Sequence, residues 1–139
     1  MYGNLFIRTQ EQVDLRSFAT RIFDLLNIGS AEMRESENYA SGEYFKAKVL
    51  GVIVKVAVAD DSEFPDFQFW INFKADKVWT EEPLWFEGLA DLIAKHLALD
   101  GFDVARAPSF GSIGGGKVLY TRKASSGEVK DQLDIRRVE

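Results

Sequence analysis

The stretch ESENYASGEYFKAKVLGVIVKVAVADDSEFPDFQFWINF, residues 35–73, decides the fold of this chain. Valines occupy every second position of residues 52–58, and aromatic or branched residues occupy every second position of residues 67–73. This period of two predicts two strands, each with one strongly apolar face, that pair as an antiparallel hairpin across an acidic loop. Residues 43–49 predict a further strand, and Gly51 predicts a bulge or bend before the valine run.

The segments outside this stretch predict two helices. Apolar residues recur at helical spacing between positions 10 and 28, after a candidate capping box that begins at Thr9. Gly29 is expected to end this helix in a left-handed conformation. A second apolar stripe follows Thr80, which can cap a helix, and Gly101 is its expected stop.

The remaining segments predict short strands and a polar tail. Strands are expected at residues 5–7, 102–107 and 117–123, while the tail, 124–139, is expected to be loose or to add one short element at its end. We therefore expect one α+β domain over residues 1–139, with a largely antiparallel sheet and two main helices packed on it.

The composition sets expectations for compartment and partners. The chain has 139 residues, of which 46% are hydrophobic, so one domain with a sizeable core is expected. A net charge of −5 argues against nucleic acid, which needs clustered Lys and Arg, and favours a basic protein partner. There is no cysteine, which excludes disulfides and thiolate chemistry. The chain shows neither a signal peptide nor an apolar run of membrane-spanning length, so a cytoplasmic protein without membrane contact is expected.

Two motifs resemble catalytic or nucleotide-binding elements. Residues 111–117, GSIGGGK, match the spacing of a phosphate-binding loop, but Val118 replaces the required Ser or Thr, and a strand is expected where a helix should begin. We interpret this segment as a connection between strands and leave its role open. His96, the only histidine, lies on the apolar stripe of the second helix and is interpreted as structural. A non-catalytic protein without a cofactor is favoured over an enzyme that uses carboxylates or a divalent metal.

The loop after the valine run is the candidate binding site. It carries four acidic residues, Asp60, Asp61, Glu63 and Asp66, whose spacing does not match a calcium-binding EF-hand loop, so no metal is expected. Trp70 follows on the polar side of the next expected strand. An aromatic residue on the polar face of a sheet suits an anchor for another macromolecule. We therefore interpret the four acids and Trp70 as a binding surface.

Three sequence motifs carry a resemblance to a known group of proteins. They are ESxNY at residues 35–39, GxYF at 42–45, and FPDFxFW at 64–70 preceded by the acidic pair Asp60-Asp61. With these motifs the chain resembles small bacterial immunity proteins of contact-dependent inhibition and other polymorphic toxin systems. The resemblance implies a cytoplasmic antitoxin that binds and blocks a cognate toxin domain, and it assigns no contact residue. The alternative is a small-ligand or partner-binding accessory domain of unrelated role.

Overall fold

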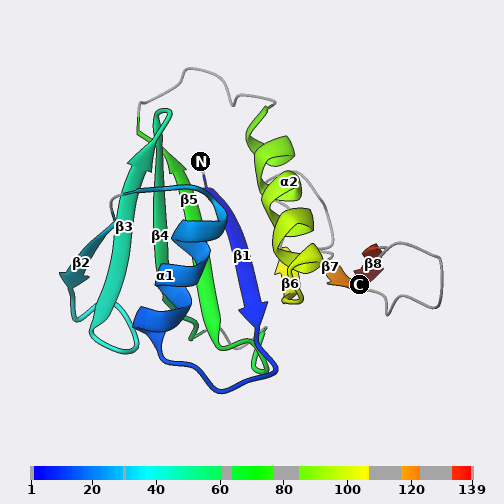
Figure 1. Cartoon of the computed structure of the whole chain (residues 1–139), viewed down its shortest axis with the longest axis horizontal. Coiled ribbons are helices and arrows are strands. Elements are labelled where there is room, and N and C mark those ends of the chain that lie inside the picture. Colours follow the sequence, from blue (N-terminus) through cyan, green and yellow to red (C-terminus); the bar gives the residue numbers. More distant parts are fainter. Residues whose placement is uncertain are drawn as a thin grey trace.

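The computed structural model describes residues 2–29, 31–60, 64–76, 85–106, 117–122 and 133–138. These residues form one eight-stranded sheet and two helices, which confirms the predicted α+β class (Figure 1). In chain order the elements are β1 (Tyr2–Arg8), α1 (Leu15–Leu25), β2 (Glu32–Glu35), β3 (Glu43–Val49), β4 (Val52–Val58), β5 (Phe69–Ala75), α2 (Trp85–Leu99), β6 (Asp103–Arg106), β7 (Lys117–Arg122) and β8 (Leu133–Val138).

The sheet has the strand order β2-β3-β4-β5-β1-β6-β7-β8, and every neighbouring pair is antiparallel. The pairing of β4 with β5 confirms the predicted hairpin. The alternation of directions makes β1 parallel to β2, and β5 parallel to β6. Parallel strands need a long crossover connection, and α1 and α2 lie on the two connections that provide it.

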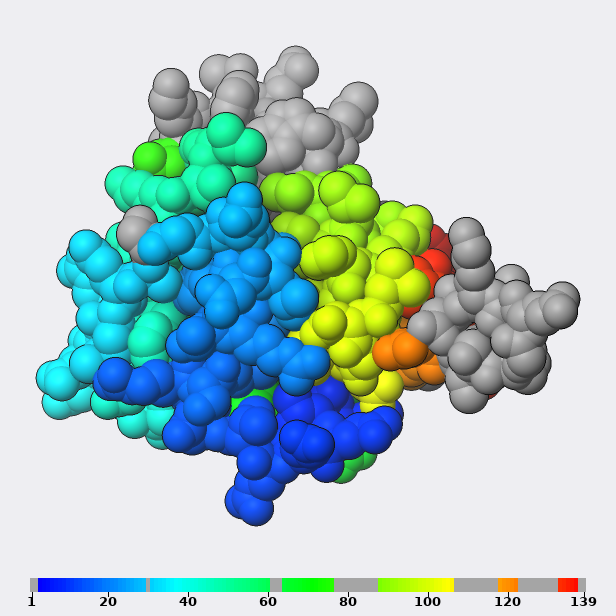
Figure 2. All heavy atoms as spheres, viewed as in Figure 1, coloured from blue at the N-terminus to red at the C-terminus, as the bar shows by residue number. Residues whose placement is uncertain are grey.

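Both helices lie on the same face of the sheet. The crossover from β1 to β2 and the crossover from β5 to β6 run in opposite directions across the sheet, but they start from strands that are themselves antiparallel. A shared crossover handedness therefore places both helices on one face. Figure 1 shows both helices in front of the sheet, and Figure 2 shows them side by side on that face.

The main core lies between this face and the two helices. Phe18 of α1 stacks on Phe69 of β5, with ring centroids 4.0 Å apart, and meets Phe102 edge-on. The valines of β4 at positions 52, 54 and 56 are buried in the same cluster, as the period of two predicted. Burial of these side chains supplies most of the driving force for packing the helices on the sheet.

The first helix is shorter at both ends than the predicted range 10–28. Its N-cap is Asp14, whose side chain accepts a hydrogen bond from the Ser17 backbone N–H at 2.7 Å, so the proposed capping box at Thr9 is wrong. The left-handed residue after the helix is Asn27, with φ of 55°, and Gly29 does not have this role. Asn tolerates this conformation because its short side chain forms local hydrogen bonds, so a helix can end here without a glycine.

Two further expectations need correction. Leu50 and Gly51 form a tight two-residue turn between β3 and β4, with φ of 51° and 77°. Of the bulge or bend expected at Gly51, the bend is therefore confirmed and the bulge is wrong. Residues 32–35, which showed no strand pattern, form the edge strand β2 because they pair with β3 although all four are exposed. In the tail, β8 is the short element that the sequence left open; residues 123–132 lie outside the described ones.

The second helix ends near its predicted stop. Gly101 has φ of 103°, a conformation that glycine adopts without strain. The proposed cap Thr80 lies outside the described residues, as does the glycine-rich segment 109–116. Lys117 begins strand β7, and no helix starts there as a phosphate-binding loop would need. Neither described helix combines the length and apolar character needed to cross a membrane.

Candidate interaction surface

No helix in the described part of the chain packs on the second face of the sheet, here called the open face. On β3, β4 and β5 this face presents nine strand positions, which the pairing register aligns in three rows across the strands. The first row is Tyr44, Ala57 and Trp70; the second is Lys46, Lys55 and Asn72; the third is Lys48, Ile53 and Lys74. The open face therefore changes from aromatic to cationic along the strands.

A polar cluster fixes the aromatic row on its β1 side. The Asn4 side-chain oxygen accepts one hydrogen bond from Trp70 Nε1 and another from Asn72 Nδ2, both 2.9 Å long. Asn72 is 6% exposed, so its amide depends on this partner for a hydrogen bond in place of water. The bond to Nε1 fixes the orientation of the Trp70 indole relative to β1, and the bond to Asn72 fixes the Asn4 side chain that accepts it.

A hollow of about 280 Å³ opens beside Trp70 at the end of the aromatic row. We call it the Asp60 hollow; its lining residues are Asn4, Phe6, Asn38, Tyr39, Ala40, Val58, Asp60 and Trp70. Tyr39 stacks on Tyr44 with ring centroids 4.3 Å apart, and its centroid lies 6.1 Å from that of Trp70. A carboxylate beside aromatic rings is an arrangement that attracts a cationic side chain.

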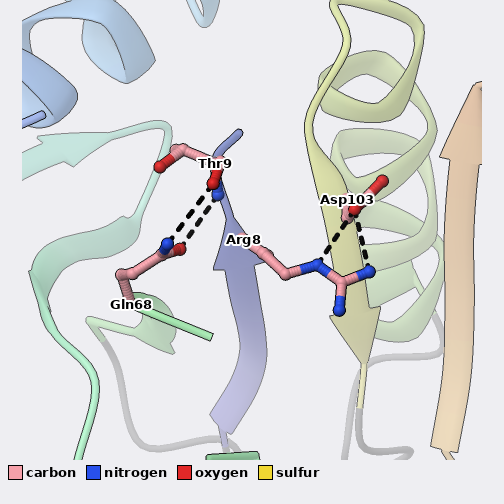
Figure 3. Close-up of polar contacts among 4 residues, drawn as sticks. All are labelled: Arg8, Thr9, Gln68 and Asp103. Carbon is pink, nitrogen blue, oxygen red and sulfur yellow. Dashed lines mark hydrogen bonds and ion pairs between the residues drawn. The ribbon is translucent and has the colours of Figure 1, made fainter. Parts of the chain in front are cut away.

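Contacts with the end of β1 hold Phe67 and Gln68, at the end of the loop that joins β4 to β5 and flanks the hollow. The Thr9 backbone N–H donates to Gln68 Oε1 at 2.9 Å, and Gln68 Nε2 donates back to the Thr9 carbonyl oxygen at 3.3 Å (Figure 3). Arg8 donates from Nε and from an Nη to Oδ2 of Asp103, and its guanidinium lies 5.1 Å from the ring centre of Phe67. These contacts connect the end of β1 to β6 and to the two residues that precede β5.

A second, smaller apolar cluster fills the open face beneath this loop. Phe64 stacks on Phe6 at 4.1 Å and meets Phe67 edge-on, and Ala105 completes the buried set. The alternation of residues 67–73 predicted that Phe67 and Phe69 lie on the same face of the sheet. This prediction is wrong, because Phe67 packs against the open-face cluster and Phe69 lies in the main core. The reason is that β5 begins only at Phe69, and the Phe67 backbone N–H bonds to the Phe64 carbonyl oxygen in a turn.

The predicted binding residues are only partly brought together. Asp60 and Trp70 line the same hollow, whereas Asp66 is exposed and is not part of its lining. Asp61 and Glu63 lie outside the described residues. Among the residues that the structure describes, no three His, Cys, Asp or Glu residues come together as a group that could hold a metal ion.

Sequence reasoning missed most of the residues of this surface. Tyr39 and Tyr44 stood in the motifs of the resemblance but received no role, and Asn4 lies far from Trp70 in the sequence. The lysines carried a readable signal, because Lys55 and Lys74 occupy the polar positions of their alternating strands. Their alignment with Lys46 and Lys48 required the pairing register, which the sequence does not contain.

His96 connects the two helices. Its Nε2 lies 3.2 Å from the carbonyl oxygen of Leu25, and a carbonyl can only accept, so the ring donates this bond. The contact joins the last turn of α2 to the end of α1 and supports the structural interpretation of this histidine.

Comparisons of the chain with protein-family models, with curated proteins and with solved structures found no match in any of the three.

Proposed function

We propose that this chain is an immunity protein that binds a bacterial toxin domain in the cytoplasm and neutralises it by covering it. The observation that carries the proposal is the open face, where the Asp60 hollow lies at the end of the row that carries the aromatic side chains of Tyr44 and Trp70. Partly exposed aromatic residues around a hollow are typical anchors of protein–protein interfaces. The three motifs on which the resemblance to immunity proteins rests include Tyr39, Tyr44 and Trp70, which lie together on this face.

The chemistry of the hollow favours a cationic group from the partner. Asp60 supplies a negative charge, and the rings of Tyr39 and Trp70 supply the π-faces on which a Lys or Arg side chain can lie. Many toxin domains that act on anionic substrates are basic, and the net charge of −5 would steer such a domain toward this protein. The proposed contact is therefore a basic side chain of the toxin domain inserted beside Asp60.

A second candidate function rests on the same hollow. Its volume of about 280 Å³ lies close to the lower end of the range of about 300–1,000 Å³ for small-molecule sites. A small cationic ligand could thus occupy it in an accessory domain of unrelated role. The two functions predict different contact areas: a protein partner would cover much of the open face, whereas a small ligand would contact only the residues that line the hollow.

The test is co-expression with the toxin domain that a neighbouring gene encodes, together with affinity measurements on the purified pair. The wild-type protein should restore growth, and Asp60→Lys should weaken binding by about tenfold or more through charge repulsion. Asp24→Lys is a matched control, because Asp24 is an exposed acid of α1 on the covered side of the sheet. A toxin domain that remains fully active beside an excess of the folded protein would refute the proposal.

A further inference from the structure

The lysines of the open face form a compact cationic patch in a chain of negative net charge. Lys46 lies directly opposite Lys55 in the β3–β4 register, and Ile53 separates Lys48 from Lys74 in the next row. We call these four residues the lysine rows. Neighbouring strands lie about 4.8 Å apart and rows about 7 Å apart, so four positive charges share a small area. None of the nine positions of β3, β4 and β5 on this face is acidic.

Neighbouring side chains neutralise this charge only in part. Glu32 lies opposite Lys46 on the edge strand, but its carboxylate pairs with Arg34 at 2.7 Å. Lys48 meets Asp76 at 3.6 Å, and the Lys55 ammonium lies 5.6 Å from the ring centre of Tyr44. Within the described residues, neither Lys46 nor Lys55 has an ion pair. Like charges directly opposite on a sheet are destabilising, so a partner that supplies carboxylates would relieve a repulsion present in the isolated protein.

The surroundings favour an acidic protein surface over a nucleic acid. Single-stranded nucleic acids bind sheets by stacking bases on free aromatic faces. Here Tyr39 already stacks on Tyr44, with an angle of 20° between the ring planes, so one face of the ring that the Lys55 ammonium approaches is covered. Asp60 at the end of the aromatic row and the net charge of −5 would both repel a phosphate backbone.

We propose that the lysine rows bind an acidic segment of the partner protein, while the Asp60 hollow receives a basic side chain of the same partner. This inference rests on the proposed function, in which the open face is the surface that covers the toxin domain. The contact surface of the partner then carries a basic side chain at one end and an acidic segment at the other. Opposite charges at the two ends of the strands fix the orientation of the partner and reject one docked in reverse.

The first experiment measures backbone amide chemical shifts by NMR during titration with a Glu-Ser repeat peptide at low salt. An extended peptide of this pattern presents carboxylates about 7 Å apart on one side, which matches the row spacing. The expected shifts lie in β3, β4 and β5 around the lysine rows, and they should vanish at high salt. A Gln-Ser repeat of the same length should produce none, and a single-stranded oligothymidylate should bind more weakly than the Glu-Ser peptide.

Paired charge variants make the result specific. Lys46→Gln/Lys55→Gln should weaken peptide binding by about fivefold, whereas Arg16→Gln/Arg137→Gln, which removes the same charge from exposed positions outside the rows, should change it little. Shifts located elsewhere, equal loss in both variants, or tighter binding of the oligothymidylate would overturn the inference. A toxin domain that stays active beside a protein that still binds the peptide at these lysines would refute the proposed function alone.

Discussion

The hydroxyl of Tyr120 on β7 donates a hydrogen bond of 2.7 Å to Oδ1 of Asp91 on α2. The same hydroxyl accepts a bond from Arg106 Nε at 2.9 Å, and Lys95 pairs with the second oxygen of Asp91 at 2.8 Å. Tyr120 is completely buried, so its hydroxyl has exchanged water for these two partners. This network ties the second helix to the half of the sheet formed by β6 and β7.

Substitution Tyr120→Phe should destabilise the protein while keeping its packing. The ring remains, but Arg106 loses an acceptor and Asp91 loses a donor beneath α2. We expect the free energy of unfolding to fall by about 1–3 kcal/mol in urea titrations. An unchanged midpoint would show that the network adds nothing to stability.

The acid side of the stability profile should depend on Asp91. Burial alone raises the pKa of this carboxyl, but the hydrogen bonds from Lys95 and Tyr120 outweigh it, and the net pKa lies below its usual 3.8. Because the folded pKa is the lower one, the stabilisation is present above pH 3.8 and is lost as pH falls through the folded value. The stability difference between wild type and Asp91→Asn should therefore narrow on acidification. A difference that stays constant with pH would contradict this assignment.

The stability of the protein at alkaline pH should depend on Tyr120. Burial and the hydrogen bond to Asp91 raise the pKa of its phenol above the usual 10.0, despite the opposing effect of Arg106. The stabilisation is then present below pH 10.0 and is lost as pH rises through the raised value. Ultraviolet titration of phenolate should show an ionisation step above pH 10.0, and this step should be missing in Tyr120→Phe.

The turn between β3 and β4 offers a stabilising substitution. Leu50 is 97% exposed and has a left-handed backbone, which leucine adopts only with strain. Leu50→Asn would produce the Asn-Gly pair typical of such turns and should raise the free energy of unfolding by about 0.5–1 kcal/mol. Gly51→Ala is the opposing control: a Cβ there has no close neighbour, so its expected loss of about 1 kcal/mol comes from the backbone alone. If Leu50→Asn does not raise the stability of the protein to heat or urea, the proposed backbone strain at Leu50 would be refuted.

The Asn4 side chain should support both the stability of the open face and the orientation of Trp70. Asn4→Ala removes the acceptor for Trp70 and Asn72 at once, with an expected cost of about 1–3 kcal/mol. A double-mutant cycle with Asn72→Ala should show coupling, because each single variant already breaks the shared bond. Strictly additive costs would mean that the two amides act independently.

Much of the fold could be read from local patterns, whereas the site could be read only in part. Alternation placed the β4 valines on the covered face and Trp70 on the opposite one, and helical spacing located both helices. The edge strand β2 gave no such signal, because an exposed strand needs no apolar period and is held by its pairing with β3. Trp70 and Asp60 were predicted together, but Asn4 and the lysine rows depend on contacts between distant segments.

The sequence by itself determined which side chains are apolar on each strand and helix, because a period of 2 or 3.6 residues is a local property. The tertiary structure decided which face of the sheet stays open. That outcome follows from the placement of β1 between β5 and β6 and from two crossovers that put both helices on one side. The register across β3, β4 and β5 then aligned lysines from separate strands into one patch, a long-range relationship that no local pattern specifies.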